Sequence, residues 1–455
     1  MSTDLVAIAV DGWTDPERLF AAHEAGLSSA FWLDAGRDAR AGWSYLGTGV
    51  REPDAGAVRG VRCDVSASSA WPAGPFSGGW VGWLGYERGA VRAGAPIWAA
   101  DEGIPLESWL RAERFAAFDH ATGRIWAVAP PTEAAEWAGV LAERVAAARD
   151  DAPAAAPASP TAGDDAPAAP QATTAATARH DPRAYADLIE RCRDAIREGD
   201  AYQLCLTTRF EVPASGEAPL DPAAVYRRLR ASSPAHHGGY IRCGDVALLS
   251  ASPEQFLTVE EGIARTRPIK GTRPRGADAA ADAALAAELR ASPKEQAENV
   301  MIVDLMRNDL SRVSDPGSIR VDALLEVESY AAVHQLVSTV SGRLRSDTKL
   351  DDLLTACFPA GSMTGAPKLS AMTILHRLEG APRGIFAGCF GYVGRDGSAD
   401  LAMIIRSIVT HPGGAYVGAG GGITWGSDAA AEVAEVGIKA RAPLAALGAA
   451  LPPGW

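Results

Sequence analysis

Residues 150–179 set the strongest limit on how this chain folds. They read DDAPAAAPASPTAGDDAPAAPQATTAATAR and consist almost entirely of alanine, proline, threonine, aspartate and glycine. The stretch has no large apolar side chain, so it cannot contribute to a hydrophobic core. We expect a disordered linker here, which separates an N-terminal half, residues 1–149, from a second half, residues 180–455.

The two halves show different patterns. Before the linker, short apolar runs stand between glycines and prolines, which is typical of strands; they are Phe31–Leu33, Trp43–Leu46 and Gly79–Trp83. After the linker, strand-like runs alternate irregularly with helix-like runs. The strand-like runs are Tyr202–Phe210, Val246–Ser250, Ile385–Val393 and Met403–Val409, and the helix-like runs are Pro182–Glu198, Ala277–Leu289, Pro293–Leu310 and Ala429–Ala440. This mixture predicts an α+β fold rather than an alternating parallel α/β fold.

The charge balance narrows the class of partner. Acidic residues outnumber basic residues by 56 to 43, which gives a formal charge of −13. Such a chain repels phosphate backbones and anionic lipids, so we expect a small-molecule partner, no nucleic acid and no membrane. The sequence shows no signal peptide and no apolar stretch of roughly 18 residues that could span a bilayer. Six scattered cysteines without a CxxC pair predict reduced thiols and a cytoplasmic location.

A basic run interrupts this acidic chain. Residues 265–275 read RTRPIKGTRPR and carry five cations in eleven positions, so an anionic partner is the simplest explanation. An exposed basic loop would have the same composition. However, Lys270 follows an apolar residue and precedes Gly271, which permits close approach of a ligand, and Thr272, a hydroxyl donor. This setting favours a nucleophilic lysine, because neighbouring cations and partial burial both lower an amine's pKa.

Two groups of glutamates occur on predicted helices. Glu295 and Glu298 precede a run that is apolar on nearly every side, and Glu432 and Glu435 share one helical stripe with Lys439. Each group alone is compatible with ordinary salt bridges. If the two helices face one another, they form an oxygen-rich site that suits Mg²⁺. The glycine run 418–422 precedes the second helix and offers backbone N–H groups to a carboxylate or phosphate.

Two further candidates are weaker when considered alone. His334 lies in an apolar run, where a histidine is more often a packed structural residue than a catalyst. Glu254 follows an apolar strand at Pro253, where regular pairing ends. Neither position by itself separates a catalytic role from a structural one.

The order of these segments resembles that of the chorismate-utilising enzymes, which include the first components of anthranilate synthase and aminodeoxychorismate synthase. The resemblance is strongest over residues 181–445, through SPEQF, PIKGTRPRG, ENVMIVDLMRNDL, HQLVST, FPAGSMTGAPK, IRSIV and AGGGI. It continues more weakly through FWLD, WSYLG and GGWVGWLGYE in the N-terminal half. It implies antiparallel β-sheets packed as a sandwich with surrounding helices, and a chorismate-binding second half.

Two positions distinguish subfamilies within this resemblance. Gln203 matches a glutamine of nitrogen-adding members, where water-adding members carry a lysine base. Lys270 matches the PIKGT of enzymes that form aminodeoxychorismate, whereas anthranilate synthases resemble PIAGT. The resemblance therefore implies amination of chorismate to 4-amino-4-deoxychorismate. Formation of anthranilate or 2-amino-2-deoxyisochorismate, with Lys270 incidental, is the alternative.

The resemblance also implies roles for individual residues. Lys270 would attack the ring, Glu254 would protonate the departing hydroxyl, and His334 would orient substrate. Mg²⁺ would be held by Glu298 and Glu435, with Glu295 and Glu432 as further candidates. Substrate would be bound by Gln203, Gly271, Thr272, Phe386, Arg406, Gly420, Gly421, Gly422 and Lys439.

The chain departs from the family pattern at several points, and its cysteines bear on the source of ammonia. Phe386 stands where relatives usually have tyrosine or tryptophan. The segments 31–36 and 234–238 differ from those that form a tryptophan pocket in many members, so tryptophan binding is not predicted. None of the cysteines lies in a GxCxG-like elbow. A separate glutamine amidotransferase subunit is therefore the expected source of ammonia.

Overall fold

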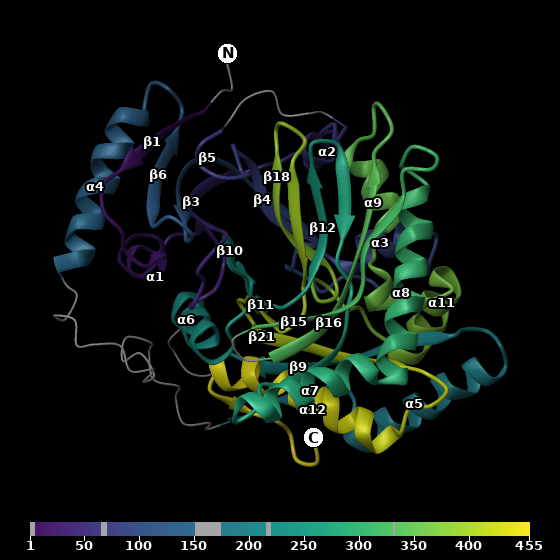
Figure 1. Cartoon of the computed structure of the whole chain (residues 1–455). Helices are drawn as coiled ribbons and strands as arrows, with labels where there is room; N and C mark the ends of the chain where they lie inside the picture. The colour runs from purple at the N-terminus through teal and green to yellow at the C-terminus, as the bar shows by residue number, and fades with distance from the viewer. Residues whose placement is uncertain (1–4, 65–70, 151–173, 215–219, 331–332) are drawn as a thin grey trace.

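The computed structural model describes residues 5–64, 71–150, 174–214, 220–330 and 333–455 (Figure 1). The helices are α1 Pro16–Leu19, a π-helical turn Phe20–Glu24, α2 Ala55–Arg59, α3 Tyr86–Arg92, α4 Ala134–Asp150, α5 Pro182–Arg197, α6 Pro222–Ser232, α7 Ala279–Ala291, α8 Pro293–Ser311, α9 Leu350–Cys357, α10 Gly361–Thr364, α11 Lys368–Glu379 and α12 Ala429–Ala446.

The strands are β1 Val6–Val10, β2 Ser29–Asp34, β3 Trp43–Arg51, β4 Gly79–Leu84, β5 Glu107–Asp119, β6 Arg124–Ala129, β7 Thr174–Ala175, β8 Thr177–Ala178, β9 Gln203–Pro213, β10 His237–Cys243, β11 Val246–Ser252, β12 Gln255–Glu260, β13 Ile263–Thr266, β14 Ile269–Pro274, β15 Arg320–Ser329, β16 Val333–Arg343, β17 Gly365–Ala366, β18 Cys389–Gly394, β19 Ala399–Met403, β20 Ser407–His411, β21 Gly414–Ile423 and β22 Ala449–Ala450.

The long strand β5 is the branch point of the sheet. One edge pairs with β3, while the other pairs with β4 and then β6. The first branch runs from β3 through β2, β10, β11, β20 and β21 to β9. The second runs from β4 through β18, β19, β12 and β13 to β16, which also pairs with β14 and β15. Among the described strands only β7 and β22 pair in parallel.

Side chains of the two branches pack face to face. Alternation along each strand sends Phe31 inward and Trp32 outward, and likewise Leu248 inward and Leu249 outward. The inner cluster joins residues of both branches. A second cluster covers the first branch with α4, α5, α6 and α12, and a third covers the second branch with α8 and α9. The predicted α+β sandwich of antiparallel sheets with surrounding helices is confirmed.

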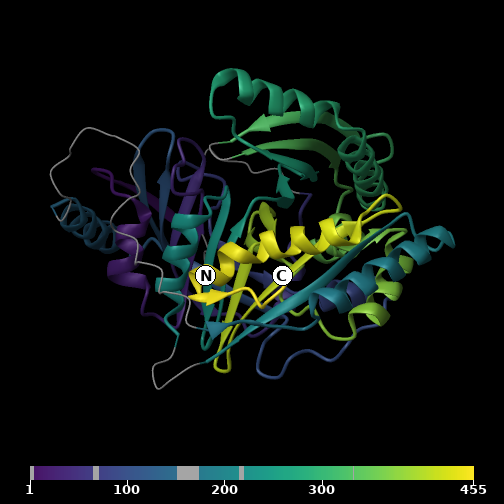
Figure 2. The ribbon, with the colours of Figure 1, turned by 90° about the horizontal axis from the view of Figure 1, so that it is seen from below.

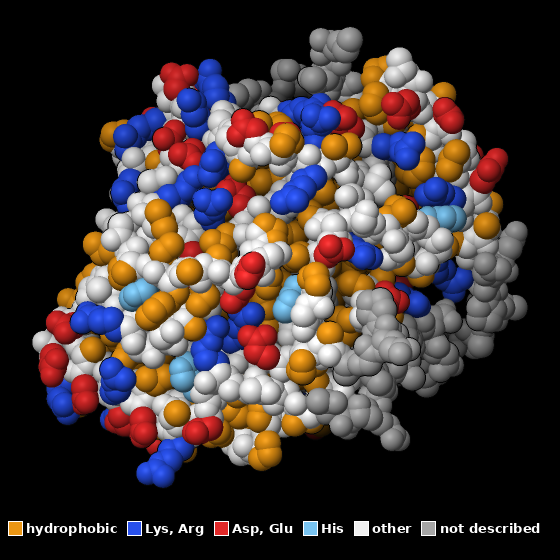
Figure 3. Space-filling view, turned by 180° about the vertical axis from the view of Figure 1, so that it is seen from behind, with side chains coloured by type: hydrophobic (Ala, Val, Ile, Leu, Met, Phe, Trp, Pro, Cys, Tyr) orange, Lys and Arg blue, Asp and Glu red, His pale blue; other side chains and the backbone are white. Residues whose placement is uncertain are grey.

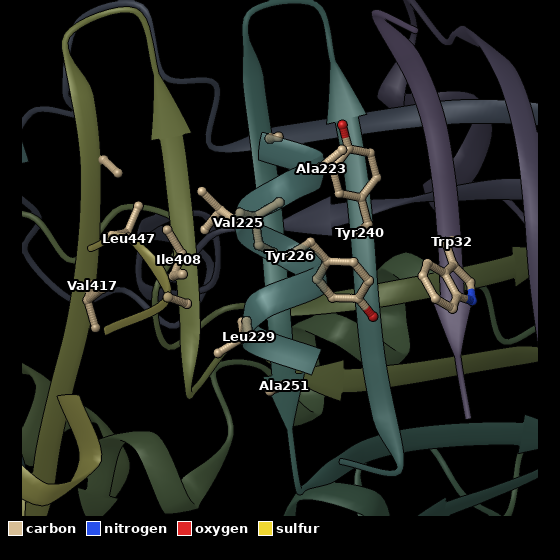
Figure 4. Close-up of a cluster of buried hydrophobic side chains, with 14 of the residues drawn as sticks. Trp32, Ala223, Val225, Tyr226, Leu229, Tyr240, Ala251, Ile408, Val417 and Leu447 are labelled. Atoms are coloured by element: carbon tan, nitrogen blue, oxygen red, sulfur yellow. The ribbon is translucent and has the colours of Figure 1, made fainter. Parts of the chain in front are cut away.

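Helix α6 illustrates this covering. Figure 4 shows its Tyr226 and Leu229 over β10 and β11, with Trp32 and Tyr240 beside them. All four side chains are buried, and burying a large apolar side chain contributes about 1.5–3 kcal/mol. The sandwich thus holds its outer helices mainly through apolar packing.

A short local signal starts several of the helices. Asp15, Asp181, Asp221 and Ser292 each cap a helix whose first residue is proline, and their side chains accept hydrogen bonds from backbone N–H groups of the first turn. Helices α5 and α8 therefore begin at Pro182 and Pro293, as predicted. The cap at Ser292 also fixes where the glutamates of α8 point.

The prediction of one continuous strand at Met403–Val409 is wrong. Strand β19 ends at Met403 and β20 starts at Ser407. Between them Arg406 has a φ of 52°, which a continuous strand cannot accommodate. The apolar run is instead a corner at which the chain passes from the second branch to the first.

The two predicted halves share one sheet, because β2 pairs with β10 and β4 pairs with β18. Within the proposed linker 150–179, residues 151–173 lie outside the described residues. At its end, β8 pairs with β9. Acidic and basic side chains are interspersed on the face shown in Figure 3. No described helix is long and apolar enough to cross a bilayer.

Candidate active site

The candidate site lies where the two branches of the sheet approach one another. Lys270 belongs to β14 of the second branch, and Gln203 and Gly422 belong to β9 and β21 of the first. A Cβ placed on Gly422 would lie 2.1 Å from Gln203 Nε2 and 3.5 Å from Lys270 Nζ. Figure 2 shows α12 (yellow) next to the lobe that contains α7, α8 and β14–β16 (green). The geometry therefore brings together residues more than 200 positions apart.

Gln203 and the glycine run fit one another. Gln203 is buried, and its Oε1 has no hydrogen-bond partner within the described part of the chain. Any side chain at position 422 would collide with the Gln203 amide, so the glycine is required there for space. The carbonyl oxygen of Gly420 accepts a hydrogen bond of 2.8 Å from Lys439 Nζ. In a strand the N–H of the same residue faces the same edge, so this edge of β21 is directed at Lys439 of α12.

Lys270 lies in an irregular part of β14. Pairing with β16 shifts register between Ile269 and Thr272, and Gly271 has a φ of 81°. The Lys270 side chain is 14% exposed, and its Nζ lies 3.9 Å from Glu298 Oε2. The bend thus turns a lysine out of a strand and toward a carboxylate on α8.

Glu254 occupies the break between β11 and β12, where its carbonyl oxygen accepts from Met403 N. The residue is 7% exposed. Burial raises the pKa of its carboxyl to about 7, and the charge of Lys270, the Ser362 hydroxyl and the charge of Lys439 act in the opposite direction. A carboxyl with this pKa holds a proton near neutral pH, which suits a general acid.

Carboxylates from α8 and α12 meet beside Lys270. Glu298 and Glu432 are nearly buried, and each lies within 4.0 Å of the Lys294 ammonium group. Glu432 Oε1 also accepts a hydrogen bond of 2.8 Å from Ser427. Burial raises the pKa of both glutamates. The two predicted helices therefore do face one another.

The other two glutamates of these groups have cationic partners of their own. Glu435 forms an ion pair of 2.7 Å with Lys439, whose charge lowers its pKa against the effect of burial. Glu295 lies beside Gly271 and 3.6 Å from an Arg273 nitrogen. Each of these two carboxylates therefore has a cation of its own close by.

The carboxylates suit a hard divalent cation. Glu298 Oε1 is buried without a hydrogen-bond partner in the described structure, which is costly unless a cation neutralises it. No group of three or more His, Cys, Asp and Glu side chains among the described residues forms a complete metal cage. Mg²⁺ commonly takes one or two carboxylates and completes its shell with water and substrate. The residues therefore fit this ion.

Three other predicted substrate contacts differ in their exposure. Arg406 reaches solvent, yet the protein around it partly desolvates the guanidinium and lowers its pKa, and the charge of Glu435 acts against that shift. Thr272 is exposed next to Gly271 on β14. Phe386 is buried, and its ring lies directly over Gly418 of β21, which leaves no room for a side chain there.

His334 is placed differently. Its Nδ1 lies 2.8 Å from Ser329 Oγ and its Nε2 lies 2.9 Å from Asp282 Oδ1, so both ring nitrogens have partners on β15 and α7. Asp282 is also paired with Arg275. Among the described residues, no hydrogen bond or ion pair joins His334 to Lys270 or Glu254. A role for His334 in orienting substrate stays a prediction.

Sequence reasoning missed Lys294, which the structure places between two carboxylates. The signal was present, because Lys294 and Glu298 are four residues apart on one helix and such pairs lie on the same face. Ser427, which holds Glu432, had no local signal. Its role depends on the turn before α12.

Comparison with known proteins identifies the family of the chain. The family described as "chorismate binding enzyme" matches residues 35–445. The chain belongs to the chorismate-binding enzyme family. An aminodeoxychorismate synthase from Streptomyces pristinaespiralis is 42% identical over 374 residues, which cover 82% of this chain and 51% of that protein. Anthranilate synthase component 1 from Streptomyces coelicolor is 39% identical, and the match covers 82% of this chain and 73% of that protein.

Solved structures of family members have the same fold. Anthranilate synthase component I from Streptococcus pneumoniae aligns with a TM-score of 0.69 and 28% identity over 97% of this chain and 92% of that one. The menaquinone-specific isochorismate synthase from Escherichia coli gives 0.67 at 19% identity, covering 97% and 94%, which supports the fold alone. The chain spans about half the length of the aminodeoxychorismate synthases that it matches.

Proposed function

We propose that this protein is the first component of an aminodeoxychorismate synthase, which converts chorismate and ammonia to 4-amino-4-deoxychorismate through a covalent lysine intermediate. The position of Lys270 carries the proposal. Its amine lies in the cleft beside Gln203 and Glu298, and its charge acts on the carboxyl of Glu254. A nucleophile and a general acid therefore share one site.

The first step would join the enzyme to the ring. The neutral Lys270 amine forms a bond to ring carbon 2, both conjugated double bonds of the ring shift by one position, and the bond from carbon 4 to its hydroxyl breaks. Glu254 donates its proton to that hydroxyl, which leaves as water, and the lysine nitrogen loses a proton. No oxidant or reductant is needed.

The second step would release the enzyme. Ammonia forms a bond to carbon 4, both ring double bonds shift back, and the bond from carbon 2 to the Lys270 nitrogen breaks. The ammonium group formed on carbon 4 loses one proton, and the lysine nitrogen takes up one as it leaves. Two successive displacements explain an amino group para to the carboxylate, since direct attack of ammonia on carbon 2 gives the ortho isomer. The enolpyruvyl group stays on the product.

The anionic substrate would be held by charges around the cleft. Bound Mg²⁺, held by Glu298 and Glu435 with Glu432 and Glu295 nearby, would supply positive charge to the ring carboxylate. Among the chain's own residues, Arg406 and Lys439 would hold the carboxylates, and Gln203, Gly271, Thr272, Phe386 and Gly420–Gly422 would shape the cleft. The unpartnered oxygen of Glu298 supports this assignment.

Ammonia would come from a glutamine amidotransferase partner. None of the cysteines lies in a GxCxG-like elbow, and all six are free and buried. Free ammonium would replace the partner less efficiently. The product is a precursor of para-aminobenzoate, which places the enzyme before folate or a specialised metabolite.

Anthranilate synthesis is the second candidate, because relatives named anthranilate synthase component 1 are 37–39% identical. The product decides between the two. The purified chain would be incubated with chorismate, MgCl₂ and ammonium, and the products separated by chromatography and mass spectrometry. We expect 4-amino-4-deoxychorismate. Accumulation of anthranilate would refute the proposal, and 2-amino-2-deoxyisochorismate would refute it equally.

A further inference from the structure

Lys294 combines an exposed stem with a charge directed at buried carboxylates. Its side chain is 57% exposed, yet Nζ lies 4.0 Å from Glu298 Oε1 and 3.9 Å from Glu432 Oε1. The side chains of these glutamates are only 12% and 6% exposed. One ammonium group therefore bridges carboxylates that belong to two different helices, α8 and α12.

The two oxygens of Glu298 are used differently. Oε2 lies 3.9 Å from Lys270 Nζ, whereas Oε1 has Lys294 at 4.0 Å and no hydrogen-bond partner within the described residues. The like charges of Glu298 and Glu432 repel one another, and the Lys294 ammonium lies within 4.0 Å of both carboxylates. Lys294 therefore supplies a positive charge close to Glu298 Oε1, the oxygen that has no hydrogen-bond partner.

Lysine is used sparingly in this chain. The sequence has five lysines among 43 basic residues, and three of them, Lys270, Lys294 and Lys439, lie around these glutamates. An ammonium group is a compact point charge on a flexible stem, unlike the planar guanidinium of arginine. A partly exposed ion pair is weak, so it can be broken at little cost.

We propose that Lys294 is a displaceable internal cation. In the metal-free protein its ammonium lies between Glu298 and Glu432, and it moves outward when Mg²⁺ binds Glu298, the proposed metal ligand that it contacts. The inference rests on the proposed function, because it requires a magnesium site at these glutamates. Lys294 then reduces the repulsion between the Glu298 and Glu432 carboxylates in the metal-free protein. It also raises the Mg²⁺ concentration needed to fill the site.

The test measures Mg²⁺ binding without turnover. The full chain, freed of metal by chelator, is titrated with MgCl₂ in a calorimeter without chorismate, and its melting temperature is recorded with and without MgCl₂. Lys294→Met should bind Mg²⁺ about two- to tenfold more tightly than the wild type, since the competing charge is gone. Its metal-free melting temperature should fall, and MgCl₂ should raise it by more than in the wild type.

Three variants complete the design. Lys294→Arg keeps the charge and should not bind Mg²⁺ more tightly than the wild type. Lys349→Met removes an exposed lysine at the start of α9 and should match the wild type. Glu298→Gln should lose Mg²⁺ binding.

The outcomes separate the two proposals. Equal or weaker Mg²⁺ binding by Lys294→Met, with binding lost in Glu298→Gln, would overturn the role of Lys294 and leave the proposed function standing. Unchanged binding by Glu298→Gln would overturn the magnesium assignment itself, and the role of Lys294 with it. A product other than 4-amino-4-deoxychorismate would overturn the proposed reaction without affecting either binding result.

Discussion

Glu87 and Glu254 are both buried, and burial raises the pKa of each to about 7. Their surroundings differ. The two oxygens of Glu87 accept hydrogen bonds of 2.7 and 3.0 Å from the backbone N–H groups of Arg383 and Gly384. Glu254 instead faces the charge of Lys270. A raised pKa therefore does not identify a catalytic carboxyl, whereas the nature of its partners does.

The same contrast in hydrogen-bond partners separates two clusters of charged residues, one formed by Glu379 with Arg383 and the other formed by Glu298 with its neighbours. Glu379 accepts from the N–H and hydroxyl groups of Thr207 and from two nitrogens of Arg383, all at 2.7–2.9 Å. Glu298 has a buried oxygen with no such donor. Strand β9 serves both clusters, with Thr207 at one and Gln203 at the other. Removing one partner from a fully paired buried charge is costly, whereas the incompletely paired Glu298 has an acceptor left for a ligand.

Among substitutions in the incompletely paired cluster around Glu298, replacement of Lys270 should reduce product formation the most. Lys270→Ala removes the proposed nucleophile, so formation of 4-amino-4-deoxychorismate should fall by roughly 10³-fold or more. Some ortho product is expected from direct attack of ammonia. Chromatography of chorismate reactions with MgCl₂ and ammonium measures both products. Wild-type activity in this variant would rule out covalent catalysis.

Glu254→Gln tests the difference between the two carboxyls. Removing the proposed general acid should lower kcat by about 10²–10⁴-fold. In the wild type the protonated form is needed, and it is lost as pH rises through about 7, so kcat/KM should decrease on the alkaline side of that value. Glu87→Gln is the matched control and should keep this pH profile. An alkaline limb that persists in Glu254→Gln would assign it to another group.

Substitutions in the Glu379–Arg383 cluster and in the Glu298 cluster should change the free energy of unfolding in different ways. Arg383→Met leaves Glu379 buried without its cation, which should cost about 3–5 kcal/mol of unfolding free energy. Glu298→Gln removes a buried charge that lacks a donor, so the unfolding free energy should stay the same or rise by about 1 kcal/mol, while Mg²⁺-dependent turnover is lost. Urea denaturation of both variants checks this. Equal destabilisation would remove the distinction between the clusters.

His334 should show the smallest effect, and it lies outside both clusters. Its hydrogen bonds to Ser329 and Asp282 predict that His334→Ala loses about 1 kcal/mol of stability. If these contacts are its main role, kcat should change less than in Glu254→Gln. A large loss of kcat with unchanged melting temperature would instead support the predicted role in orienting substrate.

Local patterns predicted much of the fold. Helices α5 and α8 start at the Asp-Pro and Ser-Pro pairs because a side-chain cap and a fixed proline φ act over a few residues. The strand predicted at Met403–Val409 was interrupted at Arg406, because an apolar run does not reveal a corner between two branches. The partners of His334 were also unpredictable, since Asp282 lies on another helix.

The sequence by itself determined the family and the candidate chemical groups, because motifs such as PIKGT and AGGGI are contiguous. It also determined that glutamates stood on one face of α8 and of α12, because helical spacing is local. Only the tertiary structure decided which of them meet. Glu298 and Glu432 face each other across Lys294 because β5 splits the sheet into two branches that return toward one another, and no local pattern records that long-range pairing.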